Sequence, residues 1–203
     1  LVLREFGEAY VSSGDGMGLI FQHHYLIKIL KTEGLDKANI SIPLFKGSTK
    51  SQQLLSIKAS AYNIQDNKIQ ETQLSTKNIF TEKTNKDFEE KKFTIPNVRV
   101  GTIIEVEYTV DDPFFYYNFH TWEFQSDIPK VSSEYWATIP GNYIYNITWR
   151  GFLKFTKQES SLVKDCYNPG AHKADCGRYI FAMENIPAFK EEAYMTAKSN
   201  FIS

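Results

Sequence analysis

Short runs in which apolar and polar residues alternate recur along the whole chain, and they constrain the fold more than any other feature. In the clearest run, every second position from residue 104 is apolar and the positions between are Glu or Thr: Ile104, Val106, Tyr108 and Val110. Successive side chains of an extended strand point to opposite faces, so this pattern predicts a strand with one buried face. The same alternation predicts strands around residues 25–29, 57–61 and 143–147.

Turn-forming residues separate these runs. Asp66-Asn67 stands between two of them and predicts a tight hairpin. Proline cannot donate a ladder hydrogen bond, so strands should end near four Asp-Pro or Ile-Pro pairs, at Pro113, Pro129, Pro140 and Pro187. The spacing of the runs predicts roughly ten to thirteen strands. We therefore expect an all-β fold, an antiparallel β-sandwich with few or no helices. Residues 1–190 should form the domain, and residues 191–203 a linker toward a downstream domain.

The charged segment 82–92 lacks an apolar stripe. A solvated loop, a short helical turn and a long edge hairpin are all compatible with it, and we favour a loop that leads into a strand.

Charge and hydropathy exclude several function classes. The 23 basic and 24 acidic residues leave a net charge of -1, which predicts no nucleic-acid partner. No apolar run approaches the roughly 20 residues of a transmembrane helix, so we expect no transmembrane segment. The chain begins at Leu1 without the features of a signal peptide, which suggests a fragment or a processed form.

The two cysteines, Cys166 and Cys176, flank His172 and Asp175 in the only local cluster that suggests chemistry. We favour a disulfide, which is typical of an exported β-protein. A zinc site would require a different spacing and a fourth ligand. A thiol nucleophile with His172 as its base, or two unpaired thiols, are the remaining alternatives.

Residues 114–122 form the densest aromatic stretch of the chain. Exposed rings there would offer a stacking surface for a glycan or a peptide, and Phe115, Tyr117 and Trp122 are the candidate binding residues. Packing within the core is the alternative, and we favour it. The adjacent His23 and His24 should point to opposite faces of a strand and cannot readily chelate one ion together.

No catalytic motif is present. The carboxylates are scattered, and the sequence contains neither a nucleophile elbow nor a phosphate-binding or dinucleotide-binding glycine pattern. We therefore expect no catalytic residue, metal ligand or cofactor in this chain.

Several segments together resemble a family of domains of unknown function that precede transglutaminase-like domains in exported Gram-negative bacterial proteins. They cover nearly the whole chain and comprise residues 26–34, 61–63, 93–108 (FTIPNVRVGTIIEVEY), 122–129 (WEFQSDIP), 133–134 and 185–192. The segment with the two cysteines belongs to no motif of that family.

The resemblance implies a β-sandwich module that lies before a papain-like catalytic domain. From it we expect a non-catalytic accessory module, periplasmic or at the cell surface, which packs against the downstream transglutaminase-like domain or presents substrate to it. The alternative is a free-standing glycan or peptide binding module that uses its aromatic surface. A purely structural spacer is a third hypothesis.

Overall fold

The computed structural model describes residues 1–12, 18–114, 116, 119–170, 173–191 and 202–203. These residues form eleven strands and two short 3-10 helices. In chain order they are β1 (Val2–Val11), β2 (Leu19–Lys28), η1 (Thr32–Ala38), β3 (Asn39–Phe45), β4 (Gln53–Gln65), β5 (Lys68–Gln73), η2 (Thr76–Asn78), β6 (Phe80–Lys83), β7 (Phe88–Thr94), β8 (Ile103–Asp112), β9 (Lys130–Pro140), β10 (Lys157–Tyr167) and β11 (Ala174–Ile186). No helix among the described residues has the length and apolar character that crossing a membrane requires.

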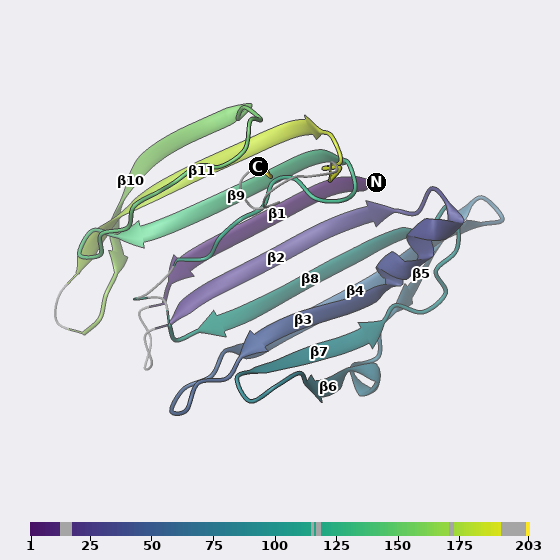
Figure 1. The fold of residues 1–203 in the computed structure, drawn as a ribbon, viewed down its shortest axis with the longest axis horizontal. Helices are drawn as coiled ribbons and strands as arrows, with labels where there is room; N and C mark the ends of the chain where they lie inside the picture. The colour runs from purple at the N-terminus through teal and green to yellow at the C-terminus, as the bar shows by residue number, and fades with distance from the viewer. Residues whose placement is uncertain (13–17, 115, 117–118, 171–172, 192–201) are drawn as a thin grey trace.

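Eight strands form one large sheet in the order β10-β11-β9-β1-β2-β8-β4-β5 (Figure 1). All neighbours in it are antiparallel except β1 and β9, which run parallel. The first strand therefore lies in the middle of the sheet, between the hairpin partner that follows it and a strand more than a hundred residues later.

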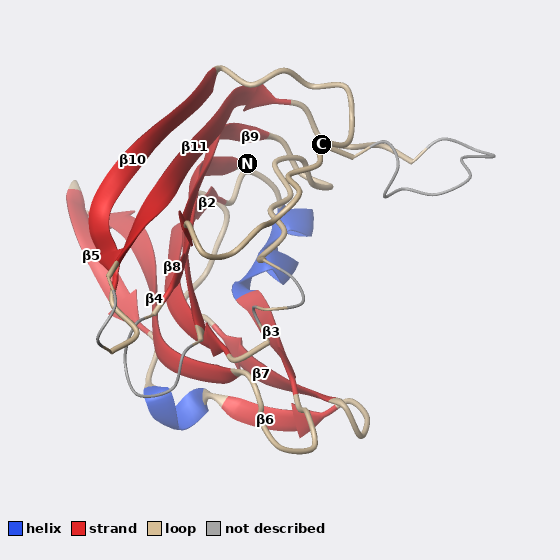
Figure 2. Ribbon diagram, turned by 90° about the vertical axis from the view of Figure 1, so that its left-hand side faces the viewer, coloured by secondary structure: helices blue, strands red, loops and turns tan. Residues whose placement is uncertain are grey.

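A second sheet of three antiparallel strands, in the order β3-β7-β6, faces one half of the large sheet. Figure 2 shows that the large sheet is strongly curved and that β3, β7 and η1 lie on its concave side. This sandwich-like arrangement of eleven strands confirms the all-β prediction, with one parallel pair as the exception to the expected antiparallel order.

The concave face is covered in two parts, and each part has its own core. The first core packs η1 and the small sheet onto β2, β4 and β8, with Ile42, Phe93 and Ile104 among its buried residues. The second packs residues 119–124 and 143–155 onto β1, β9 and β11, with Phe124 and Phe181 buried at its centre.

Three of the four strands named from alternation are present as β2, β4 and β8. The strand predicted around residues 143–147 is wrong, because this segment has no ladder partner. It follows β9, and β1 and β11 already occupy both edges of β9. The segment instead crosses the concave face, where Tyr143 and Tyr145 pack inward while Ile144 is 94% exposed.

The predicted hairpin at Asp66-Asn67 joins β4 to β5. Both residues have left-handed backbone angles, with φ of 49° and 56°, as a two-residue hairpin turn requires. In the charged segment, residues 84–87 form a turn that leads into β7, as the favoured interpretation expected, but residues 82–83 belong to β6, which makes the whole an edge hairpin. Cross-strand ion pairs such as Lys92 with Glu82 explain why so polar a segment forms strands.

Candidate functional site

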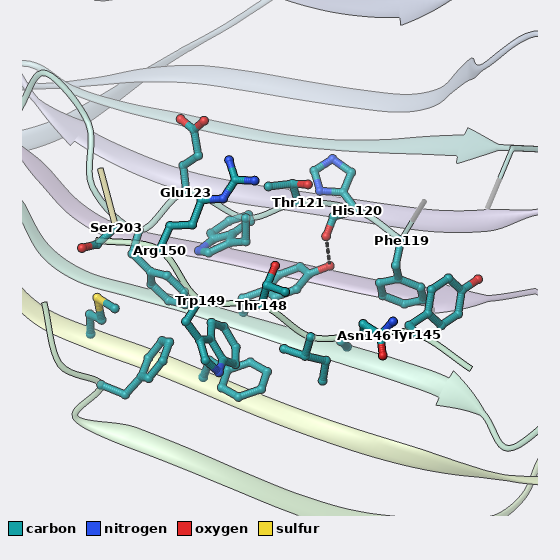
Figure 3. A pocket seen from close by; sticks show the side chains of 18 of the residues that line it. Phe119, His120, Thr121, Glu123, Tyr145, Asn146, Thr148, Trp149, Arg150 and Ser203 are labelled. Atoms are coloured by element: carbon teal, nitrogen blue, oxygen red, sulfur yellow. Dashed lines mark hydrogen bonds between the residues drawn. The ribbon is translucent and has the colours of Figure 1, made fainter. Parts of the chain in front are cut away.

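A pocket lies on the concave face, over β9 and β11 (Figure 3). It has a volume of about 430 Å³, and we call it the aromatic pocket. Its lining is formed by Phe119–Phe124, Tyr135, Ala137, Ile139, Tyr145–Arg150, Phe155, Phe181, Met183, Ile202 and Ser203. Two covering segments and two strands therefore contribute to it, which makes it a product of the tertiary fold.

Trp122 lines the aromatic pocket and packs against β1 and β9. Its indole stacks on Tyr135 with ring centroids 5.2 Å apart, and its Nε1–H donates to Ser133 Oγ at 3.1 Å. The ring lies directly over Gly7 of β1, where any Cβ would overlap it. A glycine in the middle of β1 is thus what lets the indole approach the sheet.

Trp149 forms the opposite wall. Its ring meets Phe155 and Phe181 edge to face, at centroid distances of 4.7 Å and 4.4 Å, yet 48% of the residue remains exposed. Figure 3 shows Arg150 and Glu123 on the same side of the pocket. The pocket therefore has apolar walls with charged groups along one side, which suits a polypeptide surface.

His120 lies at the inner end of the pocket. Its ring stacks on Phe21 at 3.4 Å between centroids, and its carbonyl accepts a hydrogen bond from Tyr135 Oη at 2.9 Å, drawn dashed in Figure 3. Its Nδ1 is buried without a hydrogen bond in the described structure. Burial lowers the pKa of His120 to about 4, so the ring is neutral at ordinary pH.

The last two residues of the sequence lie in the aromatic pocket. Ile202 is buried, and the Ser203 carbonyl accepts a hydrogen bond from the Gln125 backbone N–H at 2.7 Å. The Ser203 hydroxyl also accepts from the Leu153 backbone N–H at 3.2 Å. The pocket thus binds a piece of this chain through backbone hydrogen bonds and one aliphatic side chain.

The two cysteines of the predicted cluster are bonded to each other, which is the favoured one of the alternatives. Cys166 and Cys176 form a disulfide between β10 and β11, with Cα atoms 5.8 Å apart, and the sequence has no other cysteine. His172 lies outside the described residues. Among the described residues, no group of three or more His, Cys, Asp and Glu side chains is placed to bind a metal ion.

The comparisons with known proteins give one family. Residues 19–190 match the model of the family described as a domain of unknown function with a solved structure, DUF3857. The chain belongs to this family. No curated protein matches the chain.

The fold of this DUF3857 domain is similar to part of a crystal structure from Parabacteroides distasonis ATCC 8503, of a protein described as a putative protease. The TM-score is 0.64 at 12% sequence identity, over 99% of this chain and 38% of that one. The DUF3857 chain therefore spans well under half the length of the protein that it resembles.

In the structure of the DUF3857 domain, the aromatic residues that were predicted to form a binding surface make separate contacts. Phe115 and Tyr117 lie outside the described residues. The other rings of the stretch pack against different partners: Phe114 on Phe45, Tyr116 on Tyr143, Phe119 on Tyr145 and Trp122 on Tyr135. The described rings therefore contribute to packing, and no continuous stacking surface results from them.

The two adjacent histidines point to opposite faces, as expected. His23 contacts Tyr108 on the concave side, and His24 pairs with Glu105 at 2.8 Å on the other. Gln125 is buried and donates to the Pro187 carbonyl at 3.1 Å.

Sequence reasoning missed a polar cluster at the centre of the concave face of the DUF3857 domain. Lys130 Nζ lies 2.5 Å from Glu5 Oε2, and Ser133 Oγ donates to the same oxygen at 2.9 Å. The side chain of Lys130 is only 3% exposed. The partners are separated by more than a hundred residues, so no local motif could have revealed them.

Proposed function

We propose that this DUF3857 domain is a non-catalytic accessory module of a longer protein with a transglutaminase-like catalytic domain. We further propose that its aromatic pocket is where the following part of that protein docks. The observation that carries the proposal is the seating of Ile202 and Ser203 in the pocket by backbone hydrogen bonds. A chain that continued from Ser203 would leave from this pocket, beside the exposed ring of Trp149.

Three further observations support the accessory role. The chain corresponds to 38% of a longer protein described as a putative protease, so a fold of this kind occurs as one part of a larger chain. Both cysteines are joined in a disulfide, so neither is a thiolate nucleophile while it is oxidised. That disulfide also suits an oxidising compartment, which supports a periplasmic or cell-surface location.

The test compares residues 1–203 with the longer protein, using casein hydrolysis and amine incorporation as readouts. We expect activity only in the longer protein. There, Trp149→Ala should reduce activity because the indole supplies apolar contact area at the docking site. Trp136→Ala is the matched control, since Trp136 lies on the opposite face of the large sheet, where its Nε1–H donates to Glu134 at 2.7 Å.

Amide hydrogen exchange gives an independent readout of docking. Exchange of residues 145–150 should be slower in the longer protein than in residues 1–203 alone, because docking would cover this segment. Casein hydrolysis by residues 1–203 that is abolished by Cys166→Ala would refute the accessory role. Equal exchange in the two proteins would refute the docking site.

A further inference from the structure

A second pocket lies at the seam between the two covers of the concave face, and we call it the seam pocket. It has a volume of about 290 Å³. Its floor is formed by β9, β1, β2 and β8, and its walls by η1, β3 and residues 126–128. The lining residues are Val2, Glu5, His23, Tyr25, Ile27, Lys37, Asn39–Ile42, Tyr108, Ser126–Ile128 and Lys130.

The charges on the floor of the seam pocket compensate each other. The Glu5 carboxylate is paired with the Lys130 ammonium and accepts from the Ser133 hydroxyl. Burial by itself would raise the pKa of Glu5, but His23 and Lys130 together hold that pKa below its usual value. The carboxylate is therefore ionised and neutralised. A charged ligand would gain no free counter-charge there to offset its desolvation, so the floor favours a neutral one.

Two polar atoms on the floor, the Tyr25 hydroxyl and His23 Nε2, still have unused hydrogen-bonding capacity. The Tyr25 hydroxyl makes no hydrogen bond to any described residue. His23 Nε2 is buried and meets no hydrogen-bond criterion, although it lies within ion-pair distance of Glu5 Oε1, at 3.4 Å. Buried polar groups are nearly always satisfied in native proteins, so His23 Nε2 calls for a closer partner, and the half-buried Tyr25 hydroxyl is available to a ligand. An acceptor, a hydroxyl and an imidazole nitrogen side by side suit ligand hydroxyls, which both donate and accept.

The walls and the mouth restrict the size of the ligand. Aliphatic side chains from β2 and β3 line one side, and the rings of Tyr25 and Tyr108 lie near His23, with centroids 5.0 Å and 5.3 Å from its ring. A Lys37–Asp127 ion pair of 2.8 Å joins the two covers beside the pocket. Apolar walls with a hydroxyl-binding floor suit a single compact ring with C–H faces and hydroxyl edges.

From these features we propose that the seam pocket binds one neutral sugar unit through Tyr25, His23 and Glu5. This site is distinct from the aromatic pocket and does not depend on the docking proposed for it.

The indole N–H signals of the three tryptophans provide the test. Trp122 Nε1–H reports on both pockets, because the indole lines the aromatic pocket and its N–H donates to Ser133, which in turn donates to Glu5 on the floor of the seam pocket. Trp149 reports on the aromatic pocket, and Trp136 on the opposite face. A shift of Trp122 without a shift of Trp149 therefore indicates the seam pocket. Nitrogen-15 labelled protein is titrated with glucose and N-acetylglucosamine, to about 100 mM so that a millimolar site would fill. Spectra of Trp136→Phe and Trp149→Phe assign the three signals.

We expect glucose or N-acetylglucosamine to shift the Trp122 signal and leave the Trp136 and Trp149 signals in place. Glucuronate and glucosamine should bind at least about fivefold more weakly, because each brings an uncompensated charge. Binding of the dipeptide Ala-Ala in preference to the sugars would overturn the assignment. So would a sugar-dependent shift at Trp149 in place of Trp122, or no shift with either neutral sugar.

Tyr25→Phe removes only the hydroxyl and no described hydrogen bond, so the urea unfolding midpoint should stay unchanged. Sugar affinity should fall about fivefold or more, as expected for one lost hydrogen bond to a ligand. Tyr10→Phe is the matched control, because Tyr10 is a half-buried strand tyrosine outside the seam pocket. Unchanged sugar affinity in Tyr25→Phe would overturn the proposed site.

Discussion

At the scale of single residues, the close approach of Trp122 to β1 depends on the absence of a side chain at Gly7. An added methyl group would overlap the indole ring, which is itself held by its stacking on Tyr135 and its bond to Ser133. Gly7→Ala should therefore destabilise the fold by about 1 to 3 kcal/mol, as overpacking of a core does. Urea unfolding followed by tryptophan fluorescence measures the change.

Gly34→Ala is the control for that substitution. A Cβ at Gly34 would lie 3.8 Å from the Ile29 side chain, which is ordinary contact, so its stability should change by less than about 0.5 kcal/mol. Equal effects of the two substitutions would show that the indole moves aside freely.

The buried ring of His120 should make the fold sensitive to acid. Burial lowers the pKa of His120 to about 4 in the folded state, against about 6.5 in the unfolded chain. Between these values the unfolded state binds the proton better, so the stability present above pH 6.5 is lost as the pH falls toward 4. From about pH 7.5 to about pH 5 this group alone should cost about 2 kcal/mol.

The measurement is urea unfolding of the wild type and His120→Phe at both pH values. Phenylalanine retains a ring that can stack on Phe21 and has no proton to bind. The variant should lose about 2 kcal/mol less than the wild type on acidification. Parallel losses in the two proteins would contradict the buried, neutral ring.

Residue identity alone predicted less of the aromatic stretch than of the strands. The alternation at residues 104–110 reports directly which side of β8 is buried, because a strand has only two faces. Trp122 lies in a covering segment without regular structure, where no period relates position to burial. Packing was the favoured interpretation for this stretch, but Gly7 is far from Trp122 in the sequence, so this packing partner followed only from the tertiary fold.

At the scale of elements, the disulfide lies where the ladder between β10 and β11 is irregular. The register shifts between Val163 and Tyr167, and Asp165 in that interval has a left-handed φ of 51°. Cys166 and Cys176 are ten residues apart, so the bond closes a short loop and should stabilise the fold by roughly 2 to 3 kcal/mol. Urea unfolding with and without a reductant measures this contribution.

A double variant, Cys166→Ala with Cys176→Ala, controls for other effects of the reductant and should not respond to it. If the reduced wild-type protein were as stable as the oxidised one, the disulfide would contribute nothing to the fold. The cysteine spacing in the sequence suggested the pairing. The irregular ladder beside it could not be foreseen, since the bulge depends on how β10 meets its neighbour.

One element was predicted wrongly and one only in part, and both errors have the same physical cause. Residues 143–147 alternate as a strand does, yet both edges of the preceding strand β9 are occupied. Residues 82–92 carry no apolar stripe, yet cross-strand ion pairs support them as the β6–β7 hairpin. In both cases the outcome depends on whether a free strand edge is available, which a local pattern does not contain.

At the scale of the whole molecule, one curved sheet carries two separate covers, and the polar cluster lies on the face where they meet. The two covers lie over adjacent halves of the sheet, because β1 pairs in parallel with β9 at one edge and antiparallel with β2 at the other. Composition and alternation indicated the all-β class. The parallel pair and the division into two sheets depend on contacts between segments that are far apart in the sequence. The seam pocket exists because of them, which is why no motif pointed to it.

The Glu5–Lys130 pair connects β1 to β9 and tests how this long-range pairing is stabilised. Lys130→Met would leave the Glu5 carboxylate buried without its counter-charge, at an expected cost of about 3 to 5 kcal/mol. Adding Glu5→Gln should recover most of that loss, because the uncompensated charge is removed. Lys92→Met, which breaks exposed and solvent-screened ion pairs with Glu82 and Glu90, should cost much less. Urea unfolding of the three variants measures these differences.

A cost for Lys130→Met as small as that for Lys92→Met would mean that water reaches the cluster and screens it. In that case the floor of the seam pocket would also be open to charged ligands.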